Sequence, residues 1–195
     1  QFDIDELTDW YTDELFQHEN ADRLVQLVSR FVCDVERFPD DSEEMFKIGQ
    51  GICYTKGTQG NDIVVHEKEK IIENIYNEWN SKLNKMTAKS LAYFPKVVVV
   101  DCHSFIDKDK TLPDFCIGTT EHTPQILIDE VELFLNKKYS VTINTPYSGS
   151  IVPTEYKGDV NVIPIMIEVN KNLYLDGTSK NSNFINISKV VNDVL

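Results

Sequence analysis

The chain has 195 residues, of which 41% are hydrophobic, and its 32 acidic and 19 basic side chains give a formal net charge of −13. This length and apolar content are enough for a sizeable core and predict a single compact domain over residues 1–195. The strong negative charge argues against nucleic acid and anionic membrane surfaces as partners, and the sequence has no apolar run long enough to cross a bilayer.

The first half of the chain alternates between predicted helices and strands. We expect an acidic helix at residues 5–19 and a strand at residues 27–35. Apolar residues at helical spacing predict a long amphipathic helix over residues 66–85. The run of four valines at residues 97–100, which follows Pro95, is typical of a strand that is buried on both faces.

The second half continues this alternation. A second apolar stripe predicts a helix over residues 126–135, followed by a short strand at 139–143 and an apolar strand at 161–169. A helix is expected at residues 181–195. Helices that alternate with apolar strands imply an α/β fold, with a mixed but mostly parallel central sheet flanked by helices.

The four cysteines lack the paired spacing of a zinc-binding motif. Their positions in apolar segments or at strand ends predict reduced, buried thiols and therefore a reducing compartment such as the cytoplasm. They are Cys33, Cys53, Cys102 and Cys116.

Reactive side chains follow directly after the predicted strand at residues 97–100. These are Asp101, His103 and Ser104. In α/β sheets, ligand-binding groups gather beyond the carboxyl ends of the strands. A neutral histidine is a good zinc ligand, and a nearby acid can orient its ring. The alternative interpretation is a histidine that merely caps a loop.

Glu168 stands near the end of the predicted strand at residues 161–169. Burying a carboxylate there is costly unless it is paired, bound to a metal or protonated, although it could instead point into water. Two strands with reactive groups at their carboxyl ends favour one shared site. The turn-rich segment at residues 144–150 offers backbone amides and hydroxyls that can bind a carboxylate or an amide oxygen.

Short motifs in a consistent order and spacing run through most of the chain. They are LTDWYTDELF (7–16), SR (29–30), DVERF (34–38), GQGICYT (49–55), DCHSF (101–105), PDFCIGT (113–119), PYSGS (146–150) and IEVN (167–170). Together they resemble the N-formylglutamate amidohydrolase family. The resemblance implies a metal-dependent amidase with a phosphorylase/hydrolase-like fold, similar to the zinc carboxypeptidases. It also implies hydrolysis of N-formyl-L-glutamate to glutamate and formate, a step of histidine degradation in some organisms.

The resemblance implies roles for residues at the motif positions. His103 looks like a zinc ligand, with Asp101 close behind it. Glu168 looks like the general base that activates the attacking water and then protonates the leaving nitrogen, a task suited to a buried carboxylate. Asp9 looks like an acidic zinc ligand, and Asp13, one helical turn later, is the competing choice. Both acids could instead simply favour a helix N-terminus.

A second group of residues is implied on the substrate side. Arg37 looks like the residue that holds a substrate carboxylate or the developing oxyanion. Asn144, Tyr147, Ser148 and Gly149 complete the implied substrate-binding set. The implied partner is a small acidic N-acyl amino acid.

The chain departs from the family pattern in two places. Family members usually begin with a strand that ends in a His-Ser-Gly-like motif and supplies another zinc ligand, whereas this chain begins at Gln1 within the acidic segment. We therefore expect that strand and its histidine to precede Gln1, and residues 1–195 alone to bind zinc weakly and show little activity. Lys171 stands where an arginine often follows the Glu-x-Asn motif, which alters the expected substrate anchoring.

Two other classes of function stay open. A zinc carboxypeptidase, or a deacylase acting on another N-acyl amino acid, would use the same metal, water and Glu168. Arg37 and the segment at residues 147–150 favour a small acidic substrate over a long peptide. A catalytically silent binding domain would keep the same scaffold and pocket without turnover.

Overall fold

The computed structural model describes residues 2–38 and 44–195, which form two compact units. The first unit contains the described residues up to Thr8 and those of the segment Arg23–Ala88. The second contains Asp9–Asp22 and Lys89–Leu195. No helix among the described residues is both long and apolar enough to span a membrane.

The first unit is built from helices and irregular segments. Three of its helices follow one another without a break from residue 68, which confirms and extends the amphipathic helix predicted over 66–85. A buried cluster of Cys33, Val35, Ile52, Cys53 and Tyr76 forms its core. The helices are α1 (Phe2–Leu7), the 3-10 helix η1 (Glu44–Ile48), α3 (Lys68–Ile71), the π-helix η2 (Ile72–Tyr76) and α4 (Asn77–Leu91), whose last residues belong to the second unit.

The strand predicted at residues 27–35 is wrong. The peptide N–H groups of Val32 and Cys33 both donate to the carbonyl of Ser29, so residues 29–33 form turns in place of a strand. Leu27 is 88% exposed, whereas Cys33 is fully buried. The apolar residues are therefore not all directed into one core, and no partner strand is needed.

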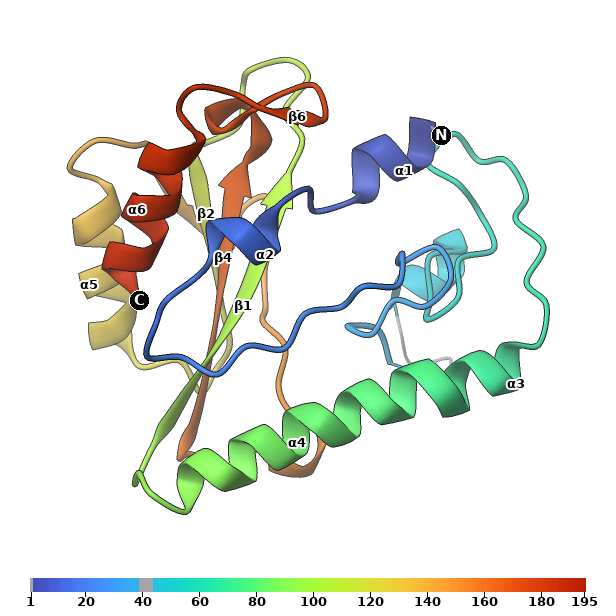
Figure 1. The fold of residues 1–195 in the computed structure, drawn as a ribbon, viewed down its shortest axis with the longest axis horizontal. Helices are drawn as coiled ribbons and strands as arrows, with labels where there is room; N and C mark the ends of the chain where they lie inside the picture. Colours follow the sequence, from blue (N-terminus) through green and yellow to red (C-terminus); the bar gives the residue numbers. More distant parts are fainter. Residues whose placement is uncertain (1, 39–43) are drawn as a thin grey trace. The chain divides into compact units, whose positions relative to one another are not determined.

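The second unit contains a four-stranded sheet with the order β1-β4-β2-β3 (Figure 1). β1 pairs with β4 and β2 with β3 in parallel, while β2 and β4 are antiparallel. This confirms the α/β class and the mixed, mostly parallel sheet flanked by helices. The strands are β1 (Val97–Phe105), β2 (Phe115–Thr119), β3 (Val141–Ile143) and β4 (Val162–Asn170).

β4 is a central strand, and each of its nine residues is buried. Ile165, Ile167 and Val169 alternate along it and pack into the hydrophobic core together with residues of α5 (Gln125–Leu135) and α6 (Phe184–Val194). Figure 1 shows both helices on the same side of the sheet. The residues that alternate with these three on β4, among them Glu168, therefore face the opposite side of the sheet. The remaining elements are α2 (Thr12–Leu15), the 3-10 helices η3 (Thr154–Tyr156) and η4 (Lys171–Leu173), and the two-stranded sheet of β5 (Leu175–Asp176) and β6 (Ser179–Lys180).

One predicted helix is divided in the structure, and one predicted strand is longer than expected. The helix expected at residues 5–19 is divided into α1 and α2, because Tyr11 adopts a left-handed backbone with φ 61° and ends helical continuity. β1 continues past Val100 to Phe105, so Asp101 and His103 lie within the strand and not beyond its end. The neighbouring strand β4 pairs with β1 as far as Phe105, which explains the extension.

The short strand β2 was not predicted. It is only five residues long and pairs with β4 on one side and β3 on the other. Its backbone hydrogen bonds therefore come from segments that are distant in the sequence. All four cysteines are free thiols, and three of them, Cys33, Cys53 and Cys116, are buried.

Candidate metal centre and active site

Polar side chains gather on the sheet face opposite α5 and α6. Asp101 and His103 are two residues apart on β1 and therefore point to the same face. Glu168 of β4 is the register partner of His103 on one side and of Cys116 on the other. Because register partners share a face, the sheet brings Asp101, His103 and Glu168 together in one region of its surface.

His103 is held between two carboxylates. Its Nδ1 lies 3.1 Å from Oδ2 of Asp9, and its Nε2 lies 2.9 Å from Oδ1 of Asp101. The imidazole is 7% exposed, so both contacts are largely shielded from water. An acid on each ring nitrogen fixes the plane and the rotation of the imidazole ring.

Asp9 reaches this position from the open edge of the sheet. β1 is an edge strand, which leaves alternate backbone N–H groups without a neighbouring strand. The N–H and the hydroxyl of Ser104 both donate to Oδ1 of Asp9, each at 3.0 Å. These two bonds hold the carboxylate so that its other oxygen, Oδ2, faces His103. Asp13 lies on α2 with an exposed side chain.

This donor set fits a zinc ion. Carboxylate oxygen and imidazole nitrogen are ordinary zinc ligands, and two ligands of one tetrahedral zinc lie roughly 3.4 Å apart. Oδ2 of Asp9 and Nδ1 of His103 are separated by 3.1 Å. Asp101 on the far ring nitrogen matches the carboxylate–histidine–metal arrangement, in which the acid orients the ligand.

Glu168 is 8% exposed, one strand away from His103. Burial of a carboxylate is costly, so its place on an otherwise apolar central strand calls for a specific reason. As the register partner of His103, it lies on the same face of the sheet as that histidine.

The turn-rich segment at residues 144–151 lies against the same face. The amide of Ile151 donates to Oδ2 of Asp101 at 2.9 Å, and the thiol of Cys116 donates to the carbonyl of Tyr147 at 3.2 Å. The Tyr147 ring also packs on Phe105, with the ring centroids 5.4 Å apart. We call this segment the 144–151 loop.

The predicted substrate residues of this loop differ in what their side chains contact. The amide of Asn144 donates to Thr119 Oγ1 at 2.7 Å and accepts from the Thr119 N–H at 2.8 Å, so it fastens the start of the loop to β2. Tyr147 and Ser148 are exposed. Gly149 has φ 83°, a left-handed backbone that glycine adopts readily.

Comparisons with known proteins identify the family and the fold of this chain. The model of the N-formylglutamate amidohydrolase family matches residues 1–175. The chain belongs to the N-formylglutamate amidohydrolase family. Its fold is similar to the crystal structure of N-formylglutamate amidohydrolase from Ralstonia eutropha JMP134, with a TM-score of 0.70, 19% identity, and coverage of 85% of this chain and 71% of that one. A gene product from Agrobacterium tumefaciens gives a TM-score of 0.62, 18% identity, and coverage of 85% and 64%, respectively. A comparison with curated proteins gave no match.

Arg37, the residue predicted to hold a substrate carboxylate or the oxyanion, belongs to the first unit. Its Nε lies 3.4 Å from Oδ2 of Asp34, a buried carboxylate that also accepts a 2.9 Å hydrogen bond from the Tyr54 hydroxyl. Burial acts to lower the pKa of Arg37, but the charges of Asp34, Tyr54 and Glu36 together outweigh it and the pKa is raised. Arg37 is therefore a firmly charged guanidinium.

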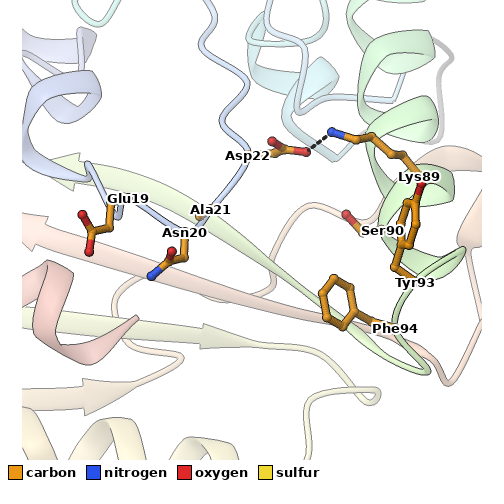
Figure 2. A pocket seen from close by; sticks show the side chains of 8 residues that line it. All are labelled: Glu19, Asn20, Ala21, Asp22, Lys89, Ser90, Tyr93 and Phe94. Atoms are coloured by element: carbon orange, nitrogen blue, oxygen red, sulfur yellow. Dashed lines mark hydrogen bonds and ion pairs between the residues drawn. The ribbon is translucent and has the colours of Figure 1, made fainter.

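A cavity of about 310 Å³ in the second unit is lined by none of the predicted site residues (Figure 2). Figure 2 shows Lys89 bound to Asp22 at one side and the rings of Tyr93 and Phe94 at another. Its lining residues are Glu19, Asn20, Ala21, Asp22, Lys89, Ser90, Tyr93 and Phe94.

Ser104 stands out in the sequence without a role, and in the structure it anchors Asp9. Cys116 and Gly118, which support the 144–151 loop from β2, were not expected at the site. The available signal was the PDFCIGT motif at residues 113–119, which carries both β2 residues. This motif belongs to the family resemblance but indicates no role by itself, because nothing local shows that β2 lies beside Glu168.

Proposed function

We propose that this protein is a zinc-dependent amidohydrolase that cleaves the amide bond of N-formyl-L-glutamate, or of a similar small acidic N-acyl amino acid. The observation that carries the proposal is the pair of Asp9 Oδ2 and His103 Nδ1, each held by further hydrogen bonds at ligand-like separation. Glu168 on the same sheet face supplies the group for proton transfer. Family membership supports the reaction class.

Asp9 and His103 would hold the zinc ion, and Asp101 would keep the imidazole in its binding orientation. A bound zinc ion polarises the amide carbonyl and acidifies the attacking water. Asp9, held through its other oxygen by Ser104, needs little rearrangement to serve as a ligand. This preorganisation lowers the entropic cost of zinc binding, because the side-chain entropy is already lost in the folded protein.

Glu168 would accept a proton from water as the water oxygen attacks the formyl carbon. It would return that proton to the nitrogen as the C–N bond breaks, releasing formate and glutamate. Its burial limits competition from bulk water for this proton. The reaction is a step in histidine degradation, and the reduced cysteines support a reducing compartment such as the cytoplasm.

The 144–151 loop would recognise the acidic part of the substrate, because the exposed Tyr147 and Ser148 offer hydroxyl groups to a carboxylate. Arg37 stays the residue that the family resemblance implies for carboxylate binding, since a guanidinium forms two parallel hydrogen bonds with a carboxylate. A small acidic substrate is thus favoured over a long peptide.

The proposal is tested with two variants and a matched control in the full protein. Glu168→Gln should keep the fold and the zinc but lower kcat for N-formylglutamate by roughly a hundredfold or more, since it removes the proton-transfer group. His103→Ala should lose stoichiometric zinc in elemental analysis. Glu130→Gln, at an exposed position of α5, should change neither quantity. Parental turnover by Glu168→Gln, or full zinc in His103→Ala, would overturn the assignment.

A further inference from the structure

Three of the contacts that the 144–151 loop makes with β1 and β2 together form a seat for the loop. β1 contributes Asp101, whose Oδ2 accepts from the Ile151 amide at 2.9 Å. β2 contributes the thiol of Cys116, which donates to the Tyr147 carbonyl at 3.2 Å, and the backbone of Gly118, against which Gly149 packs. Asp101 and Gly118 are both register partners of Met166, so these points lie in adjacent rows of one face.

Gly118 is the point of closest approach between the loop and the sheet. A Cβ atom at this position would overlap the carbonyl oxygen of Gly149 and the side chain of Met166. The terminal methyl of Met166 can move aside, but the Met166 Cβ is fixed to the backbone of β4. The Gly149 carbonyl, which is the nearest of these atoms, is backbone and can yield only if the loop itself moves. The absence of a side chain at position 118 is therefore a condition for the seated loop.

Asp101 connects the seat to the metal centre through the two oxygens of one carboxylate. Oδ1 contacts Nε2 of His103 at 2.9 Å, and Oδ2 accepts from Ile151. Because both oxygens belong to one rigid plane, displacement of the loop frees that plane to rotate about the side-chain bonds. The orientation of the His103 ring then loses one of its two restraints.

We propose that Gly118 is a positioning residue that seats the 144–151 loop, and that Asp101 couples this seating to the orientation of the His103 ring. The description of the loop as substrate-binding rests on the proposed function; the coupling itself rests on the contacts alone. Removing an outer partner of a histidine ligand typically lowers metal affinity by about 10- to 100-fold. A side chain at position 118, although it contacts neither Asp9 nor His103, should therefore weaken both metal binding and substrate binding.

The first test uses metal-free protein and does not depend on activity. Gly118→Ala should increase the exchange rate of the Ile151 amide by about tenfold or more, because the hydrogen bond to Asp101 is lost. It should also shift the ring ¹⁵N resonances of His103 in NMR spectra. Gly158→Ala is the matched control: Gly158 also belongs to the second unit, and its added Cβ meets no atom within 4 Å. An unchanged Ile151 amide and an unchanged His103 ring in Gly118→Ala would overturn the proposal.

The second test separates coupling from general destabilisation. In cobalt or zinc titrations, Gly118→Ala should bind metal about tenfold or more weakly and show a higher KM for N-formylglutamate, with a smaller change in kcat. Asp101→Asn should reproduce the shift of the His103 ring. Gly118→Ala with unweakened metal binding would refute the coupling. If the full protein neither bound metal nor turned over substrate, the proposed function would be refuted, while the metal-free NMR result would still decide the coupling.

Discussion

Asp9 is the residue that joins the segment before α2 to the edge strand β1. The sequence leaves Asp9 and Asp13 as competing ligands, but their surroundings in the structure differ. Asp9 contacts His103 and Ser104, whereas Asp13 is exposed on α2. We therefore keep Asp9 as the proposed ligand.

Asp9→Asn should lower zinc affinity by roughly tenfold or more, because an amide replaces a charged ligand and even outer partners have effects of that size. The new amide oxygen can still accept both hydrogen bonds from Ser104, so thermal stability should change little. Asp13→Asn is the matched control and should bind zinc as the parent does. Zinc titration against a chromophoric chelator measures both variants. The reverse ranking would make Asp13 the ligand.

Tyr54 makes the stability of the first unit depend on alkaline pH. Its burial, followed by the charge of Asp34, raises its pKa from 10.0 to about 12. A folded-state pKa above the unfolded value means that the folded protein retains the proton longer. This stabilisation is complete below pH 10 and is lost as the pH rises towards 12.

Between pH 9 and pH 11, the parent should therefore lose about 1 kcal/mol more unfolding free energy than Tyr54→Phe, which has no phenol to ionise at this position. Tyr93→Phe is the control, since Tyr93 is 78% exposed. Urea unfolding at the two pH values gives the comparison. Equal losses in the parent and Tyr54→Phe would show that Tyr54 does not carry this dependence.

α6 provides a test of packing at the scale of one element. Ile187 is fully buried in the core of the second unit, and Ile185, two residues earlier on the same helix, is 81% exposed. Ile187→Ala should lower the unfolding free energy by about 2–5 kcal/mol, through lost burial and the cavity left behind. Ile185→Ala should have almost no effect or a slightly stabilising one, because alanine favours helices. Similar losses in both variants, measured by urea unfolding, would contradict this placement of α6.

The two units differ in how their backbones are bonded. Among the described residues, the core cluster of the second unit contains fourteen buried side chains and that of the first unit five. The second unit has a four-stranded sheet, whereas the non-helical part of the first shows isolated bridges such as Gln50 with Tyr54.

Local opening should therefore cost less in the first unit than in the second. Hydrogen exchange followed by mass spectrometry should find the amides of β4 among the slowest, and those of residues 50–56 exchanging at least about tenfold faster. Comparable protection of both segments would show that the first unit opens only together with the sheet.

The sequence alone determined the long helix of the first unit and most elements of the second unit, and it named the two central residues of the proposed site. The helices near residues 66–85, 126–135 and 181–195 and the strands that contain Val97 and Val162 follow from local periodicity, because burial of one face imposes a repeat on neighbouring residues. His103 stood out because it follows closely after an apolar run, and Glu168 because it is a charged residue near the end of another.

Tertiary structure decided which of these side chains meet. Asp9 lies 94 residues from His103, and Asp101 lies 50 residues from Ile151, so no local pattern records either contact. The antiparallel placement of β2 beside β4 puts Gly118 under Gly149, a contact that depends on the register of two strands and the path of a loop. At residues 27–35, apolar residues suggested a strand, but the segment forms turns because no partner strand pairs with it among the described residues. Local sequence encodes burial, whereas the partners of a buried polar group are chosen only when distant segments pack together.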